Sequence, residues 1–506
     1  MLPALSLRFS EPPAGHVFLG VTYLPKDFLQ YAAISRQVVA DGSFLFYNPF
    51  TTEPQDPRFI LLFHWAVGLV ARFTGLSPID VFEWSRVPLL FVFFATLWWF
   101  LRPVFPERGD RVATAALVGF AGGLEGFARP FANRLPEGFS LRLRQDTSQL
   151  HGWSAFASFY NPLWIASLSL ALVVLRPLLF ASARTPRALA LSGAAFVVLF
   201  FVHPYTALGV LAVAALRPLV AWILREPLDV RRLLADGAVL GAALAATLAV
   251  SLWQLQDPVY RSSTGGVFGS ENLSALWYPL TLGLLGGLAL AGARRFAAAR
   301  HPARAALFAW FAAVAALHWL PVLNGYKFVF LLPLPVCILA APMARAWLEQ
   351  ARASGARRRG LALLGGVALF GGSLLHTVEA VRSVRSVSAF PTDAMQLVRI
   401  LAREPAGNVL APAGFGNVLP AFSSQRVWVG HWFLSKDYFV REQLFRRFTT
   451  KPAYEAALRG VLREDRIRHL VVPAERAERL AEQLGTQVAE RRRVGSLELF
   501  VFDPAP

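Results

Sequence analysis

One carboxylate near the start of the chain lies in a pattern suited to acid–base chemistry. Asp27, Gln30, Tyr31 and Ile34 are spaced i, i+3, i+4 and i+7, which places them on one face of a helix. A carboxylate on such a face beside a membrane can accept a proton from a hydroxyl or amine acceptor. A structural interpretation competes with this one, because Asp27 follows Pro25 closely and would also serve as a helix N-cap.

Two further segments allow both a functional and a structural interpretation. Residues 262–272 are rich in glycine, so their backbone could form a nest for a phosphate or simply be a mobile external loop. Gly430, His431 and Trp432 could form a binding surface in which the tryptophan stacks on a sugar. The alternative for Trp432 is core packing at the end of a strand.

The elements that must position these residues belong to a polytopic membrane protein. The chain has 506 residues, of which 55% are hydrophobic and only 16% charged, against about 25% charged in a soluble domain. Long apolar runs separated by short arginine clusters extend from Val87 to Ala380. The net charge of +18 therefore indicates cytoplasmic loops rather than nucleic-acid binding, which needs a basic patch interleaved with aromatic residues.

The apolar runs predict an all-α membrane domain of about ten transmembrane helices. We expect them at residues 87–105, 112–128, 161–178, 188–203, 205–224, 233–253, 277–294, 305–321, 328–345 and 360–380. Every second short loop is rich in arginine and is therefore predicted to be cytoplasmic, which leaves both ends of the chain outside. The longer arginine-containing segment 129–160 is predicted to be a folded external loop.

The two flanking segments are predicted to lie outside the membrane domain of residues 87–380. Residues 1–86 would form an external first loop, in which 59–73 lie on the membrane as an interfacial helix or form a strained eleventh span. An external start without an export signal leads us to expect a further apolar span upstream of this chain. Residues 386–506 change character and predict a soluble α/β domain.

Strand and helix patterns alternate in that C-terminal segment. Thr392 could N-cap a first helix running to about Arg403. Short buried strands are expected at residues 408–412, 426–430, 468–472 and 497–502, and helices at 437–448, 452–463 and 475–484.

The N-terminal motif resembles a known family. Asp27, Tyr31, Ile34 and Gly42 fit the pattern D-x3-Y-x2-I-x7-G before an apolar-aromatic run. This pattern resembles the first external loop of the GT-C superfamily, polytopic glycosyltransferases that move a sugar from a polyprenyl-phosphate carrier. Protein mannosyltransferases and the aminoarabinose transferase of lipid A are members.

Later parts of the chain extend the resemblance. The interfacial segment carries Leu-Phe-x-Trp and Gly68, and Arg86 enters the next span. Tyr326-Lys327, followed by Pro333 and Pro335, is similar to the Arg-Tyr and proline-containing span near the family's carrier site.

The resemblance implies roles for the acidic residues. The family's first-loop aspartate is its proposed base or acceptor-orienting carboxylate, which corresponds to Asp27, with Tyr31 on the same face. Many relatives have two adjacent acidic residues, whereas Lys26 and Phe28 flank Asp27. This departure makes a divalent metal cofactor doubtful. Glu53 is the nearest external substitute for the missing carboxylate, and loop capping is its alternative role.

The implied chemistry also needs cations, because a sugar that leaves a lipid phosphate deposits negative charge on the phosphate oxygens. The external candidates are Lys327, Arg129, Arg261 and His203. Lys327 is the only lysine in the membrane region, although it could instead snorkel to the interface. His203 lies in a tight helical hairpin, where a structural role is the alternative. We expect Asp27 and Lys327 to act as a pair on opposite sides of the anomeric carbon.

The predicted function is transfer of a hexose or pentose from a polyprenyl-phosphate carrier to an acceptor outside a bacterial cytoplasmic membrane. The partners would be that carrier, membrane lipid and an acceptor whose class stays open, without nucleic acid. A glycan or lipid transporter is the main alternative, but the chain shows neither repeated halves nor charges in the middle of spans. A non-catalytic membrane scaffold is a third possibility.

Overall fold

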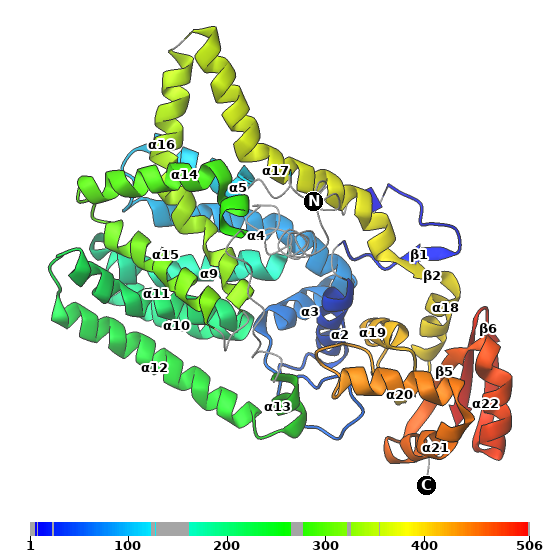
Figure 1. The fold of residues 1–506 in the computed structure, drawn as a ribbon. Coiled ribbons are helices and arrows are strands. Elements are labelled where there is room, and N and C mark those ends of the chain that lie inside the picture. Colours follow the sequence, from blue (N-terminus) through cyan, green and yellow to red (C-terminus); the bar gives the residue numbers. More distant parts are fainter. Residues whose placement is uncertain are drawn as a thin grey trace. The chain divides into compact units, whose positions relative to one another are not determined.

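The computed structural model of the protein describes residues 6–7, 9–22, 25–122, 127, 161–264, 277–320, 325–353 and 355–503. The chain forms two compact units, both visible in Figure 1. The helical unit comprises residues 85–250 and 267–380. The mixed unit comprises residues 1–84, 251–266 and 381–506 and contains both helices and strands.

An apolar helix lies at each of the ten predicted ranges. These helices are α4 (Pro78–Leu101), α5 (Arg108–Phe120), α9 (Pro162–Leu179), α10 (Pro186–Val202), α11 (Pro204–Ile223), α12 (Val230–Gln254), α14 (Trp277–Ala298), α15 (Arg304–Trp319), α16 (Pro333–Arg352) and α17 (Ala356–Ser388). Within the described residues, five are long and apolar enough to cross a membrane: α4, α9, α11, α12 and the part of α17 from Arg358. The number of about ten spans stays a prediction.

Several helix ends differ from their predicted positions. Helix α4 begins at Pro78, well before residue 87, because Ser77 accepts a hydrogen bond from the Asp80 backbone N–H (3.0 Å) and acts as its N-cap. Helix α16 begins at Pro333, and the preceding residues Gly325–Leu331 form the 3-10 helix η3. A proline lacks the N–H that a helix interior needs, so it is tolerated best in the first turn.

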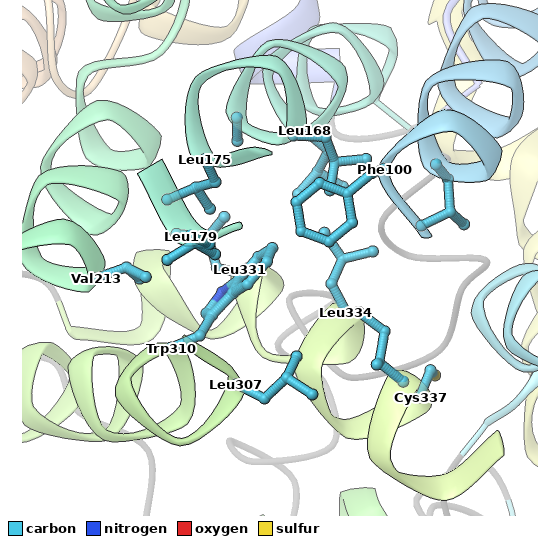
Figure 2. Packing of buried hydrophobic residues seen from close by; sticks show 14 of the residues in the cluster. Phe100, Leu168, Leu175, Leu179, Val213, Leu307, Trp310, Leu331, Leu334 and Cys337 are labelled. Atoms are coloured by element: carbon cyan, nitrogen blue, oxygen red, sulfur yellow. The ribbon is translucent and has the colours of Figure 1, made fainter. Parts of the chain in front are cut away.

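The core of the helical unit consists of side chains from several helices that converge between them. Figure 2 shows Phe100 of α4, Leu168 of α9, Trp310 of α15 and Leu331 of η3 among them, all less than 3% exposed. Helix α9 packs against α10 and α11, α11 against α15, and α14 against α16. The Ser192 hydroxyl of α10 donates to the Val174 carbonyl of α9 (2.8 Å), an interhelical bond typical of membrane bundles.

The mixed unit joins residues from both ends of the chain. Strand β1 (His16–Phe18) pairs antiparallel with β2 (Ala389–Pro391), and Val17 lies opposite Phe390. Helix α2 (Pro25–Asp41) packs against α3 (Leu62–Thr74) and against α19 (Ala413–Phe422). The segment before the apolar helices and the segment after them therefore fold together.

A five-stranded mixed sheet forms the rest of this unit. The strand order is β4-β3-β5-β7-β6, with β3 parallel to β4 and β5, and β7 antiparallel to β5 and β6. The strands are β3 (Asn408–Leu410), β4 (Arg426–Val427), β5 (Ile467–Pro473), β6 (Val488–Val494) and β7 (Leu497–Phe502). The remaining helices are α13 (Pro258–Thr264), α18 (Thr392–Leu401), α20 (Tyr438–Thr450), α21 (Glu455–Glu464) and α22 (Ala477–Leu484).

The four predicted strands are all present, whereas strand β6 and helix α19 are among the elements that were not expected. Strand β6 contains three consecutive arginines, which its position at the sheet edge exposes to solvent. Helix α19 contains two glycines and Pro420, a composition typical of a loop. Thr392 begins α18 but does not cap it, because the N-cap residue is Pro391.

Candidate active site

Helix α2 presents Asp27 near its N-terminal end, as the spacing predicts. Asp27 lies in the first turn, where the helix dipole favours a carboxylate, and its side chain is 36% exposed. Gly42 ends the helix with φ +77°, and its N–H donates to the Val38 carbonyl (2.8 Å). The D-x3-Y-x2-I-x7-G motif therefore covers this helix from its first turn to its C-terminal cap.

Tyr31 lies one turn after Asp27 and packs against α3. Its ring stacks on His64, with 4.3 Å between the ring centroids and 14° between the planes. Burial lowers the pKa of His64 to about 3, so this imidazole is neutral near pH 7. Burial, and secondarily the charge of Asp27, raises the pKa of Tyr31, so the phenol keeps its proton. The face beside Asp27 therefore combines one carboxylate with neutral aromatic groups.

The close approach of α2 and α3 depends on Gly68. A β-carbon at this position would lie 2.6 Å from the Ser35 carbonyl oxygen and 2.5 Å from the Val38 β-carbon. The Ser35 hydroxyl donates to the His64 carbonyl (3.0 Å) and joins the same two helices. Gly68, one of the residues that carry the family resemblance, therefore has a clear packing role.

The structure brings His431 to Asp27. The Nε2 atom of His431 lies 3.6 Å from the Asp27 Oδ1 atom, and the histidine side chain is only 1% exposed. Its Nδ1 atom accepts hydrogen bonds from the backbone N–H groups of Phe433 and Leu434, both at 3.2 Å. The sequence indicates each of the two residues separately, and only the fold shows that they are neighbours.

The two tryptophans near His431 have different environments. Trp432 is 51% exposed, so the interpretation that it packs in a core is wrong. Trp428 is the core residue: it is 3% exposed, and its indole N–H donates to the Asp465 carboxylate (2.9 Å). Trp428 directly follows β4, whereas Trp432 lies in the turn beyond it, which leaves its ring at the surface.

Glu53 is held by arginines of the C-terminal segment. Its carboxylate forms an ion pair with Arg441, whose guanidinium also donates to the Trp428 carbonyl (2.9 Å). Arg426 donates to the backbone carbonyls of Glu53 and Thr51. These contacts favour the loop-supporting interpretation of Glu53. In the part of the chain that the structure describes, no group of three His, Cys, Asp or Glu side chains could hold a metal ion.

Lys327 and His203 both lie close to Tyr205 in the helical unit. Lys327 belongs to η3, its ammonium group donates to the Tyr205 hydroxyl (3.3 Å), and it lies 4.5 Å from the ring centroid. The His203 ring lies 5.9 Å from that of Tyr205, and its side chain accepts from the Thr206 N–H, so it caps α11. Tyr205 was not among the predicted site residues, although it lies two positions after His203, in the first turn of α11.

The two other predicted cations are Arg261 and Arg129. Arg261 lies on α13 of the mixed unit, where it is exposed and donates through Nε and Nη2 to the Leu255 carbonyl (3.1 and 3.0 Å). Arg129 lies outside the described residues, as do residues 265–272 of the glycine-rich segment.

Comparison with solved structures identifies the fold. The Archaeoglobus fulgidus oligosaccharyltransferase tethered with an acceptor peptide superimposes with a TM-score of 0.51 and 13% identity, over 100% of this chain and 73% of that one. ArnT from Cupriavidus metallidurans gives 0.51 and 14%, over 99% and 95%. An arabinofuranosyltransferase AftD variant from Mycobacteria gives 0.50 and 17%, over 99% and 41%. No family model and no curated protein sequence matches. The chain is thus a multi-pass membrane protein with the fold of the GT-C glycosyltransferases, as its first loop predicts.

Proposed function

We propose that this protein is a glycosyltransferase that moves a sugar from a polyprenyl-phosphate carrier to an acceptor outside a bacterial cytoplasmic membrane. One observation carries the proposal: on a GT-C fold, a partly exposed carboxylate lies in the first turn of the helix that carries the family's first-loop motif. Solved structures with this fold include an oligosaccharyltransferase and an arabinofuranosyltransferase, which supports the class of reaction.

Asp27 would act as the general base. A hydroxyl or amine of the acceptor attacks the anomeric carbon and gives its proton to the Asp27 carboxylate. The bond from the anomeric carbon to the phosphate oxygen breaks, and the polyprenyl phosphate leaves with the electron pair. Tyr31, whose phenol stays protonated, would donate a hydrogen bond to a sugar or acceptor oxygen on the same helix face.

Lys327 would stabilise the leaving phosphate. Its ammonium group is held against the hydroxyl and ring of Tyr205, so a cation and an O–H group are fixed in advance of the reaction. His203 lies beside the same tyrosine and would complete this cationic region. Arg261 and Arg129 remain candidates for further contacts with the carrier, and Glu53 for contacts with the acceptor.

The test uses the purified full chain with a panel of polyprenyl-phosphate sugars and measures release of the lipid phosphate. Asp27→Asn should lower turnover by roughly 10²–10⁴-fold, the usual contribution of a general base. The matched control is Asp41→Asn, at the other end of the same helix, where the carboxylate caps the Ser43 N–H (2.7 Å). Full activity of Asp27→Asn would refute the base assignment.

Lys327→Ala gives a different expected pattern. Because the carrier carries its phosphate before the reaction as well, this variant should raise KM for the carrier and also lower kcat by roughly 10²–10³-fold. If no carrier in the panel releases its lipid phosphate, the proposed reaction is wrong, and transport or a scaffold role becomes the better hypothesis.

A further inference from the structure

We propose that His431 is a positioning residue that holds the Asp27 carboxylate through its Nε2–H group. This inference rests on the proposed function for its kinetic consequences, but the pairing itself can be tested without activity. The argument uses three features of the mixed unit: the tautomer of the imidazole, the place of its second nitrogen, and the rigidity of the loop that carries it.

The hydrogen bonds to Nδ1 determine the tautomer. Two backbone N–H groups, from Phe433 and Leu434, point at this atom, so it must be an acceptor. In a neutral imidazole the other nitrogen then carries the proton. His431 therefore presents a fixed N–H donor at Nε2.

A carboxylate lies close to that donor. The Nε2 atom lies 3.6 Å from Asp27 Oδ1 and is buried without a hydrogen-bond partner among the residues that the structure describes. Buried donors are nearly always paired, so this one marks an interaction that is completed by a small movement. Hydrogen bonds of catalytic groups are often long in ligand-free structures and shorten when the substrate is bound.

The loop that carries His431 is held on several sides. The Ser435 hydroxyl accepts from the Gly430 N–H (3.0 Å) and donates to the Phe50 carbonyl (2.8 Å). The Asn48 side chain donates to the Leu434 carbonyl (2.7 Å). These bonds connect residues 430–435 to the loop after α2, so the imidazole is fixed relative to the helix that carries Asp27.

Burial separates the roles of the two residues. At 1% exposure the His431 side chain cannot reach a substrate, whereas Asp27 is 36% exposed. His431 would therefore act only through Asp27, by fixing the orientation of the carboxylate so that its outer oxygen faces the acceptor. This gives the histidine the same supporting function that an outer-shell partner has for a metal ligand.

Two conservative variants separate this role from simple support of the loop. In His431→Asn the amide oxygen takes the place of Nδ1 and still accepts from the loop, but nothing donates at the position of Nε2. In His431→Gln the longer side chain places an N–H donor there. We expect kcat to fall by about 10–100-fold in His431→Asn, with an unchanged KM for the carrier, and to recover in His431→Gln. The control is His16→Leu, a partly exposed histidine on β1.

Non-additivity provides a second readout. The double variant Asp27→Asn/His431→Asn should be no slower than Asp27→Asn alone, because the histidine acts through the carboxylate. Wild-type kcat in His431→Asn, failure of His431→Gln to recover, or a further loss in the double variant would each overturn the proposal.

The tautomer can be measured whether or not the chain transfers a sugar. Nitrogen-15 spectra of the histidine-labelled full chain, assigned by comparison with His431→Gln, should show the His431 proton on Nε2. A proton on Nδ1 would overturn the pairing. If the wild-type chain releases no lipid phosphate while this signature is present and is altered in Asp27→Asn, the proposed function fails and the pairing of the two residues stands.

Discussion

Acidification should destabilise the mixed unit through one buried histidine. His469 lies in the middle of β5, between Val409 of β3 and Val501 of β7, and is 0% exposed. Neither ring nitrogen has a hydrogen-bond partner within the described part of the chain. Burial, with a smaller effect of the nearby arginines Arg468 and Arg492, lowers the pKa of His469 to about 4.

The sign of the effect follows from proton binding. An unfolded histidine has a pKa of about 6.5, so between pH 6.5 and 4 the unfolded chain binds more protons than the folded one. The contribution of His469 is therefore fully present above about pH 6.5 and is lost as the pH falls towards about 4. A shift of about 2.5 pH units at 1.36 kcal/mol each corresponds to about 3 kcal/mol.

The measurement compares wild type with His469→Leu in thermal unfolding between pH 8 and pH 4.5. The wild type should lose about 3 kcal/mol more than the variant, a difference of roughly 6–12 °C in Tm for a unit of this size. The stability of His469→Leu should still depend on pH to some extent, because burial also lowers the pKa of His64, to about 3. His16→Leu serves as the surface control. Identical pH profiles for wild type and His469→Leu would refute the reasoning.

Two packing predictions concern the support of the candidate site. Arg441→Met should lower the free energy of unfolding by about 1–3 kcal/mol, because it removes the closer of two cations paired with the Glu53 carboxylate, which is 19% exposed, and leaves Lys436 Nζ at 3.9 Å. Adding Glu53→Gln should restore part of the loss, and an unchanged deficit in that double variant would contradict the ion-pair account. Gly68→Ala should cost about 1–3 kcal/mol, because its β-carbon would clash with Ser35. Gly360→Ala, which meets no atom within 4 Å, is the control. Both are measured as thermal unfolding in detergent, and equal values for the two glycine variants would contradict the clash.

Local signals allowed the helices and the candidate base to be predicted. Each apolar helix can be predicted from the hydrophobic residues within its own run of sequence. The placement of Asp27 and Tyr31 on one face likewise depends only on their spacing within one helix. The predicted first residues of α4 and α16 were less accurate, because the start of each helix depends on a single residue, Ser77 for α4 and Pro333 for α16.

Long-range neighbours could not be predicted in this way. His431 and Asp27 lie at opposite ends of the chain, and their proximity depends on the packing of α19 against α2. Strand β6 was missed for a related reason: its arginines are compatible with a strand only because it is at the edge of the sheet, which its own residues do not indicate. Tyr205 gained its significance from the contact with Lys327, which comes from a distant turn.

The pairing of β1 with β2 has a consequence for biosynthesis. The mixed unit takes its first segment from before the apolar helices and its last from after them, so it cannot close until the ribosome has made nearly the whole chain. Until then α2 lacks the α19 surface that covers it, and Asp27 lacks His431. Such late, sequence-distant contacts make folding slow and leave apolar surface exposed meanwhile. A nascent or truncated chain should therefore lack the completed candidate site and expose apolar surface that chaperones can bind.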